Sequence, residues 1–277
     1  MSFPWRKYSN SELMDDYNNL RESIQNLKKI TFPIKQSNIG RKCSNYFFQH
    51  ERMKTRSQNK ISCYDFWHKN KSRIIKYKKD KSNDLFSIIN FLNHCPSQFP
   101  PFSATQIYKY FNATKILDPF AGWGDRCIAA MSMDLDYIGI DSNTHLKPHY
   151  SKMIKYFPSK SNVKMIYKRS EKVDFNKLNF DFVFTSPPYW RDNDKLLLEE
   201  YYNTETDYNK FINDVLVTII LKCLKKDKDM WVCINIPENM YKDLKKIIGP
   251  CEKILKFKSI GNTKSNKEIK NNYIYCY

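Results

Sequence analysis

Short apolar segments recur along the chain from about residue 115 onwards, and their lengths are those of strands in a buried sheet. The clearest is 181–184, which is apolar after its first residue and predicts a strand buried on both faces, as in a parallel sheet. Similar segments predict four further strands, at 115–117, 137–141, 163–167 and 230–236.

Helical spacing appears between and around these strands. The segment 207–224 places its apolar residues three and four positions apart, which predicts a helix with one buried face. Shorter helices are predicted at 104–111 and 241–248. Near the carboxyl end, 254–260 and 273–277 predict two more strands, and the segment between them is polar.

The first thirty residues predict an amphipathic helix. Between residues 10 and 30 the apolar side chains share one helical face, which is best explained as packing surface. Ser9 and Glu12 have the spacing of a capping box, which would start this helix.

Cationic and aromatic side chains are interleaved between residues 35 and 80. This mixture can stack on bases while it follows phosphates, but it is equally expected of a small packed lobe with a lysine-rich surface, and both interpretations remain open. The aromatic members are Tyr46, Phe47, Phe48, Tyr64, Phe66, Trp67 and Tyr77. The polar run 80–83 is the predicted linker out of this region.

The hexapeptide Thr-Ser-Pro-Pro-Tyr-Trp follows the strand at 181–184 directly. Pro187 and Pro188 fix φ and remove two amide donors, so this loop is stiff and its carbonyls lack ladder partners. It would emerge at the carboxyl end of the strand, where open α/β sheets bind ligands. This end of the sheet would then carry the Ser186 hydroxyl, the rigid carbonyl groups and the ring of Tyr189 together. An ordinary Pro-Pro turn after a strand is the alternative.

A glycine-containing turn, Asp118-Pro-Phe120-Ala-Gly122-Trp-Gly124, joins the strand at 115–117 to a predicted helix. Gly122 and Gly124 would let the backbone approach a ligand that a Cβ atom would exclude, and the helix amino terminus adds donors. Similar turns occur in nicotinamide- and nucleotide-binding folds, although the third glycine of the dinucleotide motif is missing here.

Asp141 ends the strand at 137–141, about twenty residues after the glycines. In this type of fold that position accepts hydrogen bonds from ribose hydroxyls. The alternative is an ordinary turn residue at the end of a strand.

Together these segments resemble the S-adenosylmethionine-dependent methyltransferases that modify exocyclic amino groups of nucleic-acid bases, the N4-cytosine and N6-adenine family. Residues 186–189 resemble its motif IV and residues 118–124 its motif I. The resemblance implies an α/β fold of class I (Rossmann-like) type: a mostly parallel sheet closed by a C-terminal antiparallel hairpin. We expect this catalytic domain at 95–277, preceded at 1–94 by a mainly helical, basic and aromatic region that contacts nucleic acid under the first of the two interpretations above.

The resemblance also implies site residues. Ser186 and the carbonyl of Pro187 would accept hydrogen bonds from the target amino group, Pro188 would complete the rigid turn, and Tyr189 would stack on a base taken out of its helix. Residues implied for S-adenosylmethionine are Asp118, Phe120, Gly122, Gly124, Asp141, Ser170 near the adenine and Phe102 near the methionine end.

The expected reaction is direct in-line displacement of the methyl group from the sulfonium. Ser in place of Asp at the start of the tetrapeptide favours N4-cytosine over N6-adenine, and DNA is favoured over RNA by the resemblance alone. An RNA-base or protein-amide methyltransferase of the same fold is one alternative. A non-catalytic nucleic-acid-binding subunit is another.

Composition adds limits. The net charge of +18 suits a nucleic-acid partner, but arginine supplies only nine of the 47 cationic residues, and such lysine excess also arises in AT-rich genomes. The eight cysteines lack metal-ligand spacing, so we expect reduced thiols and no metal. No run approaches the roughly eighteen apolar residues of a membrane helix. We therefore expect an intracellular, soluble protein without a membrane partner; the sequence gives no oligomeric state.

Overall fold

The computed structural model describes residues 2–56, 61–79, 84–93, 95–191, 195–196, 207–258 and 273–277. The predicted linker 80–83 and the polar segment between the last two predicted strands lie outside the described residues.

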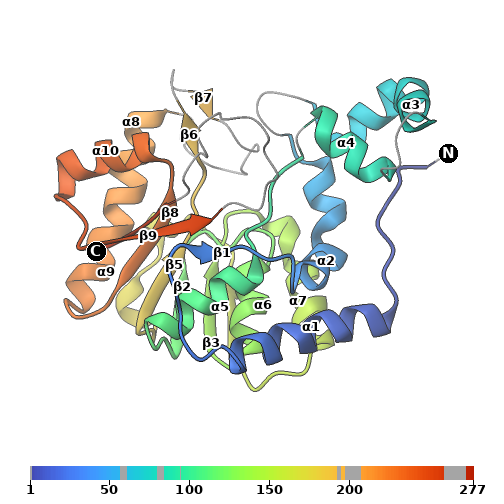
Figure 1. Cartoon of the computed structure of the whole chain (residues 1–277). Coiled ribbons are helices and arrows are strands. Elements are labelled where there is room, and N and C mark those ends of the chain that lie inside the picture. The colour runs from blue at the N-terminus through green and yellow to red at the C-terminus, as the bar shows by residue number, and fades with distance from the viewer. Residues whose placement is uncertain are drawn as a thin grey trace.

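An eight-stranded sheet occupies the centre of the molecule (Figure 1), in the order β1-β9-β10-β8-β5-β2-β3-β4. The strands are β1 (Ile34–Lys35), β2 (Lys115–Asp118), β3 (Asp136–Ile140), β4 (Val163–Ile166), β5 (Phe182–Thr185), β8 (Val232–Ile236), β9 (Lys253–Lys258) and β10 (Tyr273–Cys276). Neighbours from β4 to β8 are parallel, whereas β10 is antiparallel to both β8 and β9. The predicted class I methyltransferase fold, with its C-terminal antiparallel hairpin, is confirmed.

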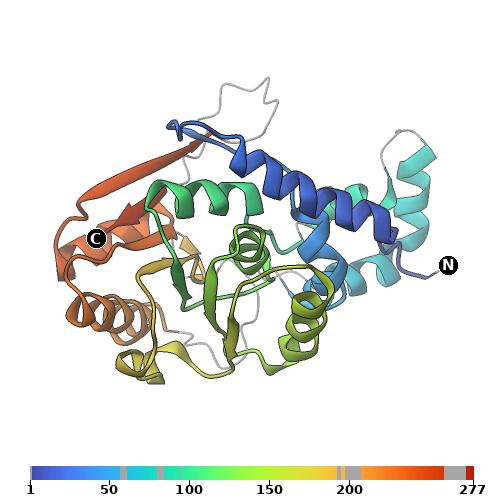
Figure 2. The same cartoon turned by 90° about the horizontal axis from the view of Figure 1, so that it is seen from below.

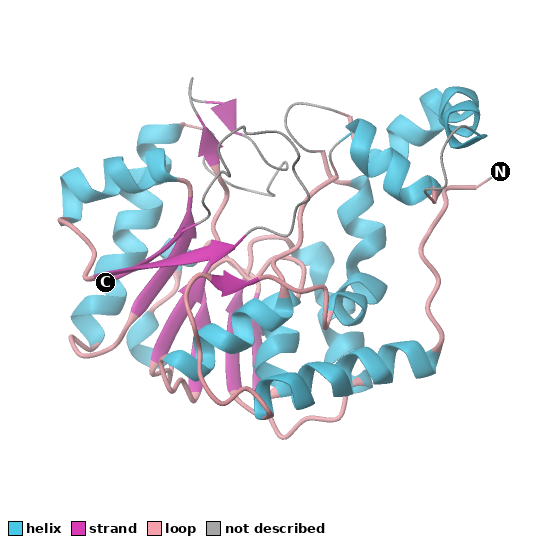
Figure 3. Ribbon diagram, in the orientation of Figure 1, coloured by secondary structure: helices cyan, strands magenta, loops and turns pink. Residues whose placement is uncertain are grey.

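Helices cover both faces of this sheet (Figures 2 and 3). They are α1 (Asn10–Gln25), α2 (Arg41–Lys54), α3 (Cys63–Lys79), α4 (Leu85–Asn93), α5 (Pro101–Tyr110), α6 (Asp125–Ser132), α7 (Lys147–Tyr156), α8 (Tyr208–Lys210), α9 (Thr218–Lys226) and α10 (Glu238–Ile248). Short helical turns are η1 (Thr144–Leu146), η2 (Ser170–Lys172) and η3 (Phe175–Lys177), a π-helical segment η4 (Phe211–Val217) precedes α9, and β6 (Trp190–Arg191) pairs with β7 (Lys195–Leu196).

The alternation of side chains along each strand divides the core into two layers. In β5, Phe182 and Phe184 belong to the layer that includes side chains of α1, α2, α5, α6 and α7. Val183 points the other way, into the layer under η4, α9 and α10. Because both faces are covered, these strands can be apolar throughout, as the sequence pattern predicted.

The capping box predicted for α1 is present: the N–H of Glu12 bonds to the Ser9 hydroxyl, and the Glu12 carboxylate accepts from the Ser9 N–H. The helix ends at Gln25, earlier than the predicted residue 30. The Lys109 ammonium donates 2.8 Å hydrogen bonds to the carbonyls of Ile24 and Leu27. A lysine from α5 thus supplies the hydrogen bonds that further helical turns would otherwise give to these carbonyl groups.

A small lobe formed by α3, α4 and the first residues of the chain has its own apolar cluster around Trp67 and Phe86. Cys63 and Cys95 form a disulfide there, with their Cα atoms 5.8 Å apart. The expectation of reduced thiols is therefore wrong for this pair, because packing of α3 on α4 joins cysteines that no short motif connects. The other six cysteines are free, and all except Cys251 are buried. Within the described part of the chain, no helix combines the length and apolar character needed to cross a bilayer.

Candidate active site

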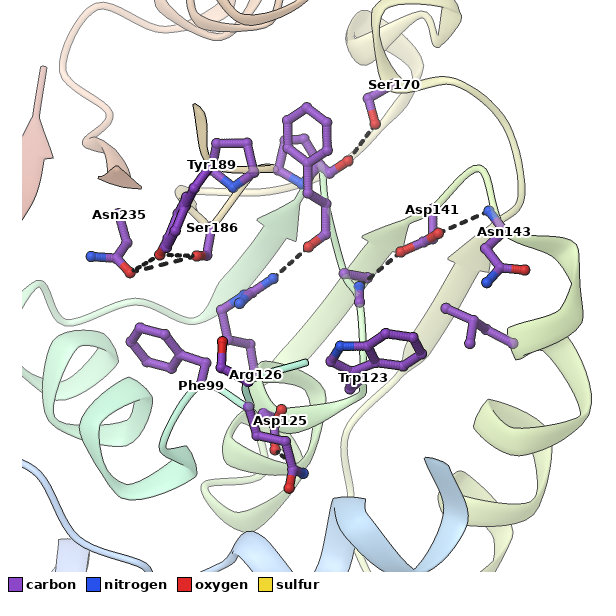
Figure 4. A pocket seen from close by; sticks show the side chains of 18 of the residues that line it. Phe99, Trp123, Asp125, Arg126, Asp141, Asn143, Ser170, Ser186, Tyr189 and Asn235 are labelled. Carbon is purple, nitrogen blue, oxygen red and sulfur yellow. Dashed lines mark hydrogen bonds between the residues drawn. The ribbon is translucent and has the colours of Figure 1, made fainter. Parts of the chain in front are cut away.

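A cavity of about 320 Å³ opens at the carboxyl ends of the parallel strands (Figure 4). The loops that follow β2, β3, β4 and β5 line it, together with Asn235 from β8. Its size lies at the lower end of the range of small-molecule sites, ~300–1,000 Å³. Figure 4 shows Ser186, Tyr189 and Asn235 on one side of the cavity and Asp141 with Asn143 on the other, with Trp123 and Arg126 between them.

The two glycines of the turn after β2 have different surroundings, although both have positive φ, 60° at Gly122 and 77° at Gly124. A Cβ atom on Gly122 would meet nothing nearer than the Phe120 carbonyl oxygen at 3.9 Å, so the space beside this glycine is open. A Cβ atom on Gly124 would lie 2.6 Å from Cε2 of Phe48. Gly122 therefore serves the cavity, whereas Gly124 serves the packing of α2 on this turn.

Asp118 does not line the cavity and holds the turn in place from the side that faces away from it. Its buried carboxylate pairs with the Arg126 guanidinium at 2.7 Å, and it accepts hydrogen bonds from Thr185 Oγ1 at 2.7 Å and the Tyr137 hydroxyl at 2.6 Å. Arg126 also donates to the carbonyl of Phe120, which does line the cavity. A charge buried this completely is tolerated because every partner is in place.

Asp141 fixes the loop after β3 to the glycine turn. Its Oδ2 accepts from the N–H of Gly122 and its Oδ1 from the N–H of Asn143, each at 2.8 Å. Burial raises the pKa of Asp141 to about 6, and the two N–H bonds act in the opposite direction. A carboxylate offers about four acceptor positions, so this one retains capacity for a ligand hydroxyl.

The loop after β5 forms a chain of hydrogen bonds. Ser186 Oγ lies 2.6 Å from the Tyr189 hydroxyl, which donates to Asn235 Oδ1 at 2.5 Å, while Asn235 Nδ2 donates to the Tyr273 carbonyl at 2.8 Å. Tyr273 thereby fixes the orientation of the amide. Because the single proton of Tyr189 is used on Asn235, the short contact with Ser186 needs the serine's proton. The oxygen of Ser186 is then left as an acceptor.

A further wall combines residues from three elements, Arg41 of α2, Gln98 ahead of α5 and Asp125 of α6. Asp125 Oδ1 accepts from Ser44 Oγ at 2.5 Å and from Gln98 Nε2 at 3.1 Å, while no described residue donates to Oδ2. Burial raises the pKa of Asp125 to about 6. The Nε of Arg41 is buried without a hydrogen-bond partner among the described residues, and the charge of Arg41 interacts with that of Asp125. This wall thus presents one cation and one anion.

Ser170 is buried, lines the cavity and donates its hydroxyl to the Pro119 carbonyl. It lies in η2, a single helical turn after β4. The hydroxyl of Ser170 therefore holds the loop after β2 at this edge of the cavity.

Of the residues singled out in the sequence, the structure brings seven to the cavity: Ser186, Pro187, Tyr189, Phe120, Gly122, Asp141 and Ser170. It does not bring the other four there: Pro188, Asp118, Gly124 and Phe102. Phe102 is the second residue of α5, and Phe99 and Pro100 just before the helix line the cavity instead. The roles assigned to the lining residues stay predictions.

Sequence reasoning assigned no role in the cavity to Asn235, Arg41, Gln98 or Asp125. Asn235 offered one signal, as a polar side chain inside an otherwise apolar strand. Arg41 and Gln98 offered none, because tertiary packing alone brings them to the cavity. In the described ranges no three His, Cys, Asp or Glu side chains are grouped to hold a metal ion.

Neither a protein-family model nor a curated protein matches the chain. Several solved methyltransferase structures resemble it. A putative class I S-adenosylmethionine-dependent methyltransferase from Listeria monocytogenes is 13% identical over 96% of this chain and 86% of its own, with a TM-score of 0.43. A putative methylase from Haemophilus influenzae is 16% identical over 61% and 82%, with a TM-score of 0.38.

The tRNA (uracil-54, C5)-methyltransferase from Pyrococcus abyssi, crystallised with S-adenosyl-L-homocysteine, is 14% identical over 62% of this chain, with a TM-score of 0.41. The match spans only 36% of the length of that enzyme. Identities and TM-scores are low throughout, so function has to be argued from the residues of the cavity.

Proposed function

We propose that the chain is an S-adenosylmethionine-dependent methyltransferase that acts on an exocyclic amino group of a nucleic-acid base. The observation that carries the proposal is the arrangement of one cavity. Its glycine turn and Asp141 suit a nucleoside, and across from them Ser186 presents an acceptor oxygen beside the ring of Tyr189. A binding scaffold has no chemical use for this combination.

The residues present fit S-adenosylmethionine at three points. The open space beside Gly122 admits the ligand close to the backbone, and Asp141 accepts hydrogen bonds from the ribose hydroxyls. The free Oδ2 of Asp125 suits the ammonium of the amino-acid end, and Arg41, whose Nε has no described partner, suits its carboxylate. When bound, the cofactor supplies a methyl group already activated by the sulfonium charge.

The protein's part in the reaction is to orient and polarise the target amino group. Its lone pair is delocalised into the base and must be localised for attack. The Ser186 oxygen and the Pro187 carbonyl accept hydrogen bonds from its N–H groups. These hydrogen bonds become stronger as positive charge develops on the nitrogen. Asn235 keeps the proton of Tyr189 away from that oxygen, and the Tyr189 ring stacks on the base.

The finer assignment within this proposal is DNA, with N4 of cytosine ahead of N6 of adenine. It is supported by the resemblance of residues 186–189 to motif IV and by serine at its first position. The same acceptor chemistry would serve an RNA base, so both nucleic acids belong in the experiment.

In the test, DNA and RNA are incubated with the protein and with cofactor labelled in its methyl group. The nucleic acids are then digested to nucleosides, and the labelled nucleoside is identified by mass spectrometry. We expect labelled N4-methyl-2′-deoxycytidine from DNA. Ser186→Ala should lower the rate by at least about 100-fold, as for loss of one polarising group in other enzymes. Cofactor affinity, measured by calorimetry, should not change.

Ser103→Ala is the matched control, since it removes a buried hydroxyl that has no described partner and does not line the cavity. It should leave rate and cofactor affinity unchanged. A wild-type chain that binds no cofactor would favour the scaffold alternative. Full activity in Ser186→Ala would refute the catalytic assignment.

A further inference from the structure

A second hollow lies on the side of the molecule, between residues 5–8, α2 and α7, and we call it the α2–α7 groove. Four cationic side chains contribute to it: Arg6, Lys7, Lys152 and Lys155. All four are exposed, and none of the residues that line the groove is acidic. The nearby carboxylate of Glu51 lies 3.6 Å from Nε2 of His149. The charge of Arg6 is partly balanced by Asp84, so Lys7, Lys152 and Lys155 carry the positive charge of the groove.

Aromatic rings accompany these charges. Tyr46 is 39% exposed, and its ring centroid lies 6.4 Å from that of Tyr156. Trp5 and His50 also line the groove, and their ring centroids lie 4.0 Å apart. Rings beside cations can stack on bases while the cations meet phosphates.

The groove shares its two helices with the active-site cavity. Leu146, next to the start of α7, lines the cavity, and His149, Lys152 and Lys155 follow at intervals of three residues along the groove. Arg41 of α2 and Thr55 at its end line the cavity, whereas Tyr46, Gln49 and His50, on the opposite face of this helix, line the groove. A strand with one base in the cavity would therefore reach the groove past the start of α7, where Leu146 and His149 are three residues apart.

The groove differs from the aromatic and basic region that the sequence suggested. Phe48 and Trp67 of that region are completely buried and cannot stack on a ligand. In their place, α7 contributes Lys152, Lys155 and Tyr156, which lie far along the chain.

We propose that the α2–α7 groove binds the nucleic-acid strand that flanks the target base, with Lys152 and Lys155 on phosphates and Tyr46 on a neighbouring base. This inference rests on the proposed function and adds where the substrate lies. An acidic peptide would use the cations but would have no use for the rings, which favours a nucleic acid.

The test measures binding of fluorescent single-stranded DNA and RNA of one sequence to the full chain over a series of salt concentrations. Lys152→Ala/Lys155→Ala should weaken binding about tenfold near 0.1 M salt, and the slope of log affinity against log salt should fall by about 1.4, since each phosphate contact contributes about 0.7. Tyr46→Ala should weaken binding about tenfold without changing that slope.

The matched control is Lys225→Ala/Lys228→Ala, which removes two exposed lysines with the same spacing near the opposite, amino-terminal edge of the sheet. It should leave affinity close to wild type. Equal weakening of binding by both lysine pairs, or an unchanged salt slope in the Lys152/Lys155 variant, would refute the proposal that the groove binds the strand. So would poly-glutamate bound as tightly as the oligonucleotides.

The two proposals fail separately. Cofactor affinity by calorimetry should be the same in wild type and in all groove variants. If wild type binds no cofactor and transfers no methyl group, the proposed function fails. If methyl transfer persists while the groove variants bind the strand normally, only the groove is wrong. Comparison of the DNA and RNA arms shows which of the two the groove prefers.

Discussion

Three aspartates at one corner of the sheet edge have different partners. Asp118 is engaged by Arg126, Thr185 and a tyrosine hydroxyl, and Asp141 accepts one backbone N–H on each oxygen. Asp125 differs, because its Oδ2 has no described donor. The charges of Arg41, Arg52 and Arg126 offset part of the cost of burying this carboxylate, but none of them donates a hydrogen bond to Oδ2. The oxygen without a donor is the physical reason for placing the cofactor's ammonium there.

The pH dependence of cofactor binding follows from this placement. Burial raises the pKa of Asp125 to about 6, so the carboxylate gains a proton and loses its charge as the pH falls through that value. At pH 5.5 about a quarter of it stays ionised, and binding should be about fourfold weaker than at pH 7.5.

Asp125→Asn should bind weakly at both pH values and lose this part of the dependence, as calorimetric titrations at pH 5.5 and 7.5 would measure. Asp141, whose pKa burial also raises to about 6, accounts for whatever dependence remains. Wild-type affinity and an unaltered pH profile in Asp125→Asn would exclude the assignment.

Local rules were enough to find Gly122, Asp141 and Ser186, because each lies at the end of a predicted strand or in the turn after it, and the carboxyl ends of parallel strands meet at one edge. Arg41 and Asn235 could not be found in this way. Each comes to the cavity through an element whose position depends on tertiary packing, α2 in one case and the strand order of the sheet in the other.

At the scale of elements, the turn between β2 and α6 is held from two sides. One side faces the cavity and the other receives Phe48 of α2. The two glycines divide these tasks, although both were predicted to face the ligand. Nothing local could separate them, because the difference lies in what packs against each.

Alanine substitutions should separate the two tasks. Gly124→Ala would place a Cβ atom 2.6 Å from Phe48 and 3.1 Å from Met153. We expect a loss of about 3 kcal/mol in the free energy of unfolding from overpacking and left-handed strain together. Gly122→Ala meets no such neighbour and should lose only about 1–2 kcal/mol.

Cofactor affinity should show the reverse order, with Gly122→Ala the more damaging, since its methyl group would occupy the open space beside the turn. Urea denaturation and calorimetry measure the two quantities on the same samples. Equal effects of the two variants on both quantities would contradict this division.

Other elements show where pattern reasoning succeeds and stops. The helix predicted at 207–224 is present, but it begins with α8 and the π-helical η4 before α9, a change of hydrogen-bonding pattern that apolar spacing does not encode. The strand β1 has only two residues and no alternation to detect. It is a strand because β9 provides a parallel partner.

For the whole molecule, the first fifty residues belong to the wall of the catalytic half. Leu13, Tyr17 and Phe48 share one apolar cluster with Ile116 and Phe182 of the sheet. The ion pair of Arg21 with Asp134, at 2.7 Å, adds a polar contact between α1 and the turn before β3. The division at 94/95 stays a prediction about organisation, and this packing bears on how the catalytic half folds.

A fragment of residues 95–277 should not fold by itself. Removing α1, β1 and α2 would expose the apolar side chains they cover and leave one edge of β9 unpaired. We expect circular dichroism without a cooperative thermal transition and a collapsed amide proton spectrum. A fragment that unfolds cooperatively near the melting temperature of the full chain would show that the catalytic half is independent.

The pairing of β1 with β9 sets an order of events during synthesis (Figure 1). Ile34 lies opposite Phe257, so almost the entire polypeptide must leave the ribosome before this pairing can form. The apolar stripe of α1, by contrast, packs on α2, α5 and α6, which are all translated well before β9. Strand β1, although translated early, is therefore among the last segments to be fixed in place, after the helices on either side of it in the sequence can pack.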